Sequence, residues 1–136
     1  MSHFDQVVAL LKGTGFTVHA GRVPDFPQFP YAVLWWPGAP RRSVYNLRGD
    51  SGHAETVFQI TSVGLTLQSV QIVAQAMQDA VLDAVVEADG WVSHRIKHAG
   101  TVVPIQEDRD VIDEATKRHP FYTVDTYRLS AEVDPD

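Results

Sequence analysis

A strand pattern that runs directly into a long helix pattern, between Glu55 and Val86, is the feature that most constrains the fold of this chain. Residues 55–64 (ETVFQITSVG) are rich in β-branched and aromatic side chains, which is typical of a strand. In the segment that follows, LTLQSVQIVAQAMQDAVLDAVV, apolar residues recur at helical spacing. We therefore expect a strand and then a long amphipathic helix, and we expect this unit to anchor the fold.

The flanking segments predict one helix before this unit and strands on both sides of it. Ser2 can cap a first helix that ends near Gly13. Strands are expected at Phe16 to Val23, at Tyr31 to Trp36 and at the closing segment Phe121 to Val133. The pattern indicates a single domain over residues 1–136 of the α+β class: a mostly antiparallel sheet flanked by an N-terminal helix and one long central helix, with a protruding loop or hairpin.

Two further segments lie between the central helix and the closing strand. Trp91 to His98 and Thr101 to Ile105 read as a pair of strands bent at Ala99-Gly100. Gln106 to Pro120 (QEDRDVIDEATKRHP) reads as a charged connection.

Composition excludes several classes of function. The net charge of −6 disfavours nucleic-acid binding through a generally basic surface. Without cysteine the chain offers no disulfide, thiolate nucleophile or zinc-thiolate site. The N-terminus is unlike a signal peptide and no apolar run approaches about 20 residues, so we expect a cytoplasmic protein without a membrane partner.

The central helix carries more apolar residues than one buried face can hold. A core stripe is expected from Val70, Val73, Ala74, Met77, Val81, Ala84 and Val85. Ile72, Leu82 and Val86 fall off this stripe and would be exposed in a monomer. Trp35 and Trp36 point to opposite faces of their strand, so one of them needs a helix or a neighbouring subunit as cover. We assign Ile72, Leu82, Val86 and Trp36 to a subunit interface.

The segment Pro37 to Ala54 contains three arginines and one aspartate, which gives it a local charge of +2. A loop of this length is uncommon unless it has a function. Arg41, Arg42 and Arg48 are therefore candidates for contacts with the acidic residues of another subunit. The alternatives are a solvated loop tip and a contact with phosphate.

Three patterns suggest chemistry, and none predicts a catalytic, metal or cofactor site. His94 and His98 have a helical ligand spacing but lie on an expected strand, where they are well separated. The acidic cluster Glu107 to Glu114 lacks the glycine and the ligand spacing of a calcium loop. Ser51 and His53 lie in GDSGH, which resembles a serine-protease motif, but no second histidine and aspartate stand in a suitable context.

In the order of its elements the chain resembles the tail terminator (tail completion, or minor tail) proteins of long-tailed bacteriophages, the kind found in actinobacterial phages. The resemblance covers nearly the whole chain. It is carried by FDQVVALLKG, GRVPDFPQFPYAVLWWPG, the protruding RRSVYNLRG, the unit HAETVFQITSVGLTLQSVQIVAQAMQDAVLDAV, and the closing HPFYTVDTYRLSAEV.

The resemblance implies an α+β fold and a non-enzymatic structural role without cofactors. In that family a hexameric ring caps the tail tube, halts its polymerisation and then joins the tail to the head. The implied partners are further copies of the chain, the tail tube protein and the head-tail connector protein, and DNA only passes through the lumen. The implied location is the tail and neck of the virion, assembled in the host cytoplasm. The alternatives are another neck component, such as a connector or adaptor, or a small α+β ligand-binding domain or enzyme with Trp36, His53 and the arginine loop around a pocket.

Overall fold

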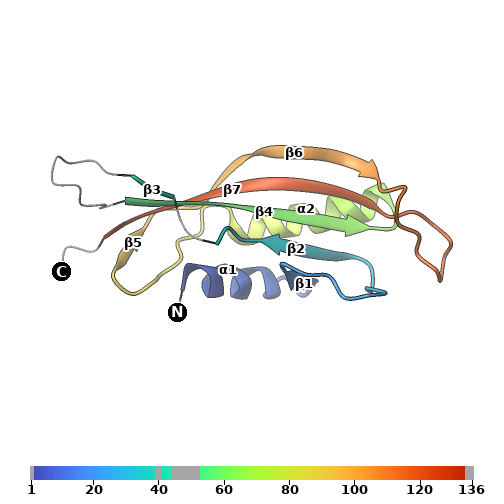
Figure 1. The fold of residues 1–136 in the computed structure, drawn as a ribbon, viewed down its shortest axis with the longest axis horizontal. Helices are drawn as coiled ribbons and strands as arrows, with labels where there is room; N and C mark the ends of the chain where they lie inside the picture. Colours follow the sequence, from blue (N-terminus) through green and yellow to red (C-terminus); the bar gives the residue numbers. More distant parts are fainter. Residues whose placement is uncertain (1, 39–40, 44–52, 134–136) are drawn as a thin grey trace.

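The computed structural model describes residues 2–38, 41–43 and 53–133, and within these it contains two helices and seven strands (Figure 1). In chain order they are α1 (His3–Lys12), β1 (Thr17–Ala20), β2 (Tyr31–Trp35), β3 (Arg41–Ser43), β4 (His53–Gly64), α2 (Leu67–Val81), β5 (Trp91–Ser93), β6 (Lys97–Glu107) and β7 (Phe121–Val133). The class is α+β, as the sequence predicted.

The two longest strands, β4 and β7, form the spine of the sheet. They pair antiparallel along their whole length, from His53 opposite Glu132 to Gly64 opposite Phe121. On the far side of β4 lie β2 and β3, and on the far side of β7 lie β5 and β6, all antiparallel. β1 pairs with β2 in parallel. The sheet is thus mostly antiparallel, as predicted.

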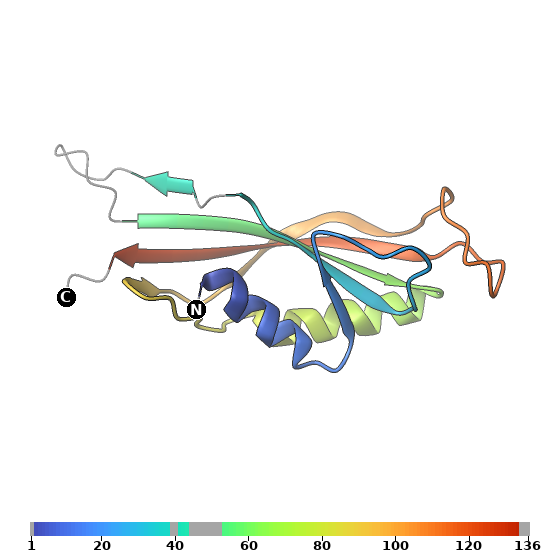
Figure 2. The ribbon, with the colours of Figure 1, turned by 60° about the horizontal axis from the view of Figure 1, so that its bottom comes forward.

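Both helices lie on one face of the sheet (Figure 2). Each begins at a residue that satisfies its free backbone amides. The Ser2 hydroxyl accepts from the Asp5 amide and the Asp5 carboxylate accepts from the Ser2 amide, while the Thr66 hydroxyl accepts from the Ser69 amide. The buried stripe of α2, made of Val70, Val73, Met77 and Val81, packs toward the inner residues of β4 and β7.

The second face of β2 has its own apolar cover. Tyr31 and Val33 form a smaller cluster with Val63, packed against Val23 and Phe29 from the segment that precedes β2. Since Ala32 and Leu34 belong to the main core, β2 is buried on both faces, as its apolar pattern predicted.

The segment after α2 differs from the prediction in two ways. β5 and β6 do not pair with each other but with different parts of β7, and β6 runs through Ala99-Gly100 with a register shift. The predicted strand pair is therefore wrong. α2 ends at Val81, about one turn earlier than the apolar pattern indicated, because Leu82 is extended and the Asp83 amide donates to the Ile96 carbonyl.

Candidate assembly surfaces

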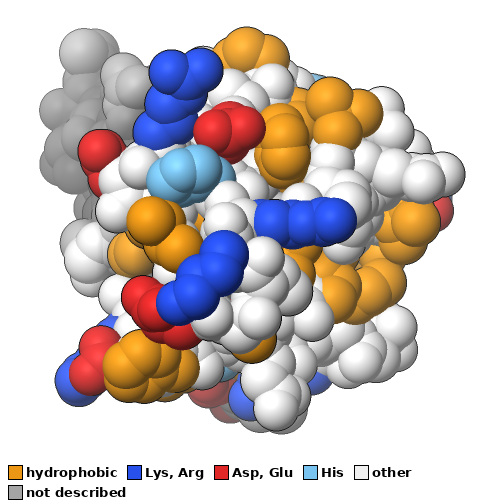
Figure 3. Space-filling view, turned by 90° about the vertical axis from the view of Figure 1, so that its right-hand side faces the viewer, with side chains coloured by type: hydrophobic (Ala, Val, Ile, Leu, Met, Phe, Trp, Pro, Cys, Tyr) orange, Lys and Arg blue, Asp and Glu red, His pale blue; other side chains and the backbone are white. Residues whose placement is uncertain are grey.

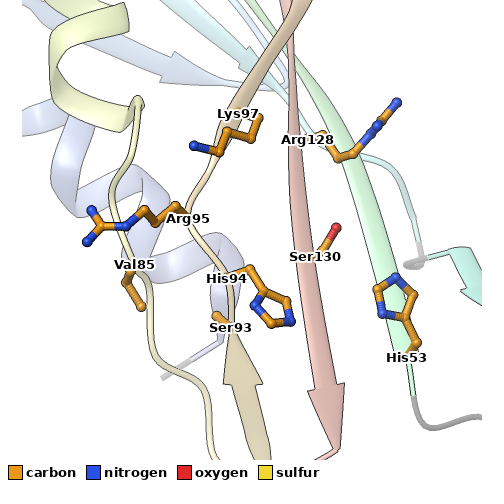
Figure 4. Close-up of a pocket in the computed structure, with 8 residues that line it drawn as sticks. All are labelled: His53, Val85, Ser93, His94, Arg95, Lys97, Arg128 and Ser130. Carbon is orange, nitrogen blue, oxygen red and sulfur yellow. The ribbon is translucent and has the colours of Figure 1, made fainter.

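A pocket with a cationic lining lies where β4 begins and β7 ends. His53 lies on β4, and Arg128 and Ser130 lie on β7 (Figure 4). Lys97 is the first residue of β6, and Arg95 lies two residues before it. Val85, Ser93 and His94 complete the lining of this open depression of about 760 Å³. We call these eight residues the cationic pocket. Among the described residues, its lining contains three permanent cations and no carboxylate. The alternation of β4 and β7 places His53, Arg128 and Ser130 on one face of the sheet.

Carboxylates at the rim of the cationic pocket hold two of its cations. Lys97 Nζ lies 2.7 Å from Asp83 Oδ1, and this hydrogen bond together with the lysine charge lowers the pKa of Asp83. Arg128 Nε lies 3.3 Å from Glu55 Oε1. Arg95 instead donates through Nη1 to the Asp83 backbone carbonyl at 3.2 Å. The described partner of Arg95 is therefore a neutral carbonyl oxygen rather than a carboxylate.

An apolar groove lies at the opposite end of the molecule, where the segment before β2 meets the connection between β6 and β7. It is open, about 790 Å³ in volume, and is lined by Asp25, Phe26, Pro27, Gln28, Phe29, Tyr31, Leu65, Val111, Ile112, Asp113, Glu114 and Ala115. We call this set the apolar groove. Phe26 is 86% exposed and Ile112 is 52% exposed, and Figure 3 shows hydrophobic side chains over this end of the molecule among charged ones. The described residues of the lining include three carboxylates and no cation.

Phe26 is unfavourably placed in an isolated chain for two reasons. Its side chain is exposed to water, and its backbone has φ of 54°, in the left-handed region that bulky residues avoid. That conformation costs about 1–2 kcal/mol for a residue with a Cβ atom. Strain at an exposed aromatic residue is a reason to ask what the residue contacts in an assembly.

The outer side of α2 presents one of the residues assigned to an interface. Ile72 is 56% exposed, as expected, and lies among glutamines of the same helix face. Leu82 is half-buried. Val86 is only 2% exposed and belongs to the main core, so the expectation that it is exposed is wrong. The physical reason is the early end of α2, which turns the chain so that Val86 enters the core and Val85 faces outward.

The two adjacent tryptophans are on opposite faces, and the cover of Trp36 comes from its own chain. Its indole stacks on Phe58 with ring centroids 5.1 Å apart and meets the edge of Phe4 at 5.5 Å. Trp35 is the more exposed of the two, and its Nε1 donates to Thr61 Oγ1 at 2.9 Å. The need for a neighbouring subunit to cover Trp36 is therefore removed.

The arginine segment falls mostly outside the described residues. The backbone of Arg41 and Arg42 forms part of β3, opposite Glu55 and Ala54 of β4. Arg48 and Ser51 lie outside the described residues, and contacts of the three arginines stay predictions. His53 lies in the cationic pocket and Trp36 packs against the core, so the structure does not bring them together as the alternative ligand pocket required.

The two histidines with helical ligand spacing lie beside different carboxylates. His94 Nε2 lies 3.6 Å from Glu132 Oε1, and His98 Nε2 lies 3.1 Å from Asp125 Oδ1. Among residues 2–38, 41–43 and 53–133, no cluster of three or more histidine, aspartate or glutamate side chains is arranged to hold a metal ion. The same residues include no helix that is long and apolar enough to span a membrane.

Comparison with known proteins gives a match to a solved structure. No protein-family model matches the chain, and no curated protein matches it. The chain is similar to one in the structure of the "virion of native gene transfer agent (GTA) particle", with a TM-score of 0.63 and 17% sequence identity. The similarity covers 96% of this chain and 95% of that chain. At this identity the match shows that the two chains share a fold over nearly their whole length.

Proposed function

We propose that this protein is a structural component of a phage-like virion, and that it forms a ring that caps the tail tube, stops tube polymerisation and joins the tail to the head connector. The observation that carries the proposal is the near-complete structural match to a chain of a virion particle. The resemblance of the element order to tail terminator proteins supports the finer role. Such a role requires surfaces for self-assembly rather than a catalytic site.

The proposed partners are other copies of the chain in a hexameric ring, the tail tube protein and the head-tail connector protein. Exposed apolar side chains at three places support such contacts: the apolar groove, the outer side of α2 at Ile72, and Val85 in the cationic pocket. Contiguous exposed apolar surface commonly marks an interaction site. In the virion the ring would lie at the neck of the tail, and DNA would pass through its lumen.

Tail length in the phage that encodes this chain tests the proposal. With the protein present, tails should have one length, and without it they should be overlong and not joined to heads, as measured by electron microscopy of negatively stained lysates. Expression of the chain from a plasmid is the control and should restore both properties. Unchanged tail lengths and normal virions in its absence would refute the role. Tails of normal length that fail to join heads would instead favour a connector or adaptor.

The assigned ring interface has its own test at Ile72 and Leu82. Ile72→Asp and Leu82→Asp should dissociate rings while the monomer stays folded. In an interface of about 800 Å² per subunit, the desolvation of an unpaired carboxylate opposes association. Gln71→Asp, on the same helix but already polar, is the matched control. Mass photometry measures the ring, in the presence of tail tube ends as well as in their absence. Rings that persist in both apolar variants would contradict this interface.

A further inference from the structure

We infer that the apolar groove of one copy receives the cationic-pocket end of a second copy, so that copies associate head to tail along the long axis of the molecule. The inference rests on the proposed function in that it takes self-assembly as given, and it names the two surfaces that meet. The connections that line the groove lie at one end of the longest axis, and β5 and the beginning of β4, beside the pocket, lie toward the other end (Figure 1). One copy therefore cannot bring its own groove and pocket together.

Charge is the first argument for a second copy as the occupant. In the part of the chain that the structure describes, the lining of the apolar groove includes three carboxylates, Asp25, Asp113 and Glu114, and no cation. Among the described residues, the lining of the cationic pocket includes Arg95, Lys97 and Arg128 and no carboxylate, and the neighbouring carboxylates of Asp83, Glu55 and Glu132 lie beside Lys97, Arg128 and His94. Opposite charges on two surfaces of one chain steer two copies into a head-to-tail orientation and repel head-to-head pairing.

The strength of this pairing depends on which charges are available. Lys97 and Arg128 have carboxylate partners in their own chain, while the described hydrogen bond of Arg95 goes to a carbonyl oxygen. On the groove, Glu114 pairs with Lys117, and the Asp113 carboxylate accepts from the Thr116 hydroxyl and amide. Asp25 is exposed and precedes Phe26. Arg95 and Asp25 are therefore the residues with which we test the contact.

Apolar surface is the second argument, because it is present at both ends. The groove presents Phe26, Val111 and Ile112, and the opposite end presents Val85 and Val92, which line one depression beside the cationic pocket. Burying these side chains against one another would remove apolar surface from water at the centre of the contact and leave the charged residues around it, which is the usual arrangement of an interface.

The backbone of Phe26 is the third argument. In the free chain Phe26 exposes an apolar ring to water and has a strained left-handed backbone. Burial of the ring against Val85 or Val92 of a second copy would offset both costs. A head-to-tail contact uses two different patches and therefore repeats, closing a ring when the rotation between copies permits it. This geometry matches what a ring-forming protein requires.

Charge reversal tests the contact through concentration-dependent association, followed by sedimentation equilibrium up to about millimolar protein. Arg95→Glu and Asp25→Arg should each weaken association at least tenfold. The double variant Arg95→Glu/Asp25→Arg should return to within about threefold of the unaltered chain, since every contact then has the swapped pair. Lys12→Glu, an exposed cation in neither surface, is the control and should associate normally. Single variants that associate as the unaltered chain does, or an unaltered chain that stays monomeric, would overturn the inference.

Phe26→Gly gives a readout that a general loss of stability cannot mimic. Glycine relieves the left-handed backbone, which offsets the greater freedom that it gives the unfolded chain, so the melting temperature of the dilute monomer should not fall, while association should weaken at least tenfold. A variant that associates unchanged would overturn the inference. A different result would refute the proposed function alone. In that case head-to-tail association would respond to these variants, although the protein neither caps tubes nor changes tail length. Rings that cap tubes in each of the three single variants would leave the proposed function standing and remove this docking surface.

Discussion

Gly64→Ala should destabilise the protein because the end of β4 touches the first turn of α2 at that glycine. A Cβ atom at Gly64 would lie 2.6 Å from Ser69 Oγ, 2.9 Å from Ser69 Cβ and 3.1 Å from the Val70 amide nitrogen. The first two distances are shorter than any stable contact between such atoms, so the strand or the helix must shift. The strand and helix are the unit that positions the main core, and a shift there is transmitted to it.

The magnitude follows from two opposing terms. Forcing an extra methyl group into a packed contact typically costs 1–3 kcal/mol. Replacing glycine by alanine also restricts the unfolded chain, which favours folding by about 0.4–1 kcal/mol. We expect the free energy of unfolding to fall by about 1–2 kcal/mol. Gly38→Ala is the matched control, since a Cβ atom there meets no described residue within 4 Å, and it should leave stability unchanged or slightly raised.

A double-mutant cycle with Ser69→Gly isolates the contact itself. Ser69→Gly removes the two closest atoms, and alone it should cost about 0.5 kcal/mol through the lower helix propensity of glycine. In that background Gly64→Ala should cost less than about 0.5 kcal/mol, giving a coupling energy near 1 kcal/mol. Urea denaturation followed by tryptophan fluorescence measures all four chains. If Gly64→Ala unfolds at the same urea concentration as Gly38→Ala, the close approach of β4 and α2 is refuted.

Two further predictions concern the core and the pH dependence. Phe58→Ala removes a ring stacked between Trp36 and Tyr127 and should lower the free energy of unfolding by about 3–5 kcal/mol in urea denaturation, with Val57→Ala on the exposed side of the same strand as control. Burial lowers the pKa of His3 below its ordinary 6.5, so the unfolded chain binds more protons and stability falls as pH drops through that value. His3→Gln should reduce this fall in melting curves recorded between pH 7.5 and 5, and an unchanged pH dependence would contradict it.

Local patterns predicted the elements whose periodicity and packing agree. The β4 and α2 unit and the long closing strand have side chains that alternate or recur as a buried face requires, and the structure has them at nearly the expected residues. The cap at Ser2 was predicted and is confirmed. The cap of α2 at Thr66 was not predicted, and the helix begins slightly later than the apolar pattern does.

Features that depend on pairing between distant segments were not predictable. The local sequence does not indicate that β5 and β6 both pair with β7, because strand pairing depends on packing across the whole sheet. The apolar groove brings together residues 25–31 and 111–115, which are far apart in sequence. Its signal was present in part: Phe26 stands among prolines, and Val111 and Ile112 interrupt a charged connection. Only the fold shows that these apolar residues share one surface.

Two adjacent valines after α2 distinguish a helix that ends at Val81, as in the structure, from one that continues as the apolar pattern indicates. If the helix continued as the apolar pattern indicates, Val85 would be buried and Val86 exposed. In the structure Val85 is 54% exposed and Val86 is 2% exposed, because Leu82 is extended and hydrogen bonds join Asp83 and Ala84 to Ile96.

Val86→Ala should therefore lower the free energy of unfolding by about 2 kcal/mol, since it removes two buried methyl groups at about 0.8 kcal/mol each and leaves a small cavity. Val85→Ala should cost less than about 0.5 kcal/mol, because an exposed methyl group loses little on truncation. Both are measured on dilute protein, so that self-association does not contribute. The two hypotheses predict opposite rank orders for the same chemical change one residue apart. A larger loss in Val85→Ala than in Val86→Ala would show that α2 continues past Val81 and that this account of its end is wrong.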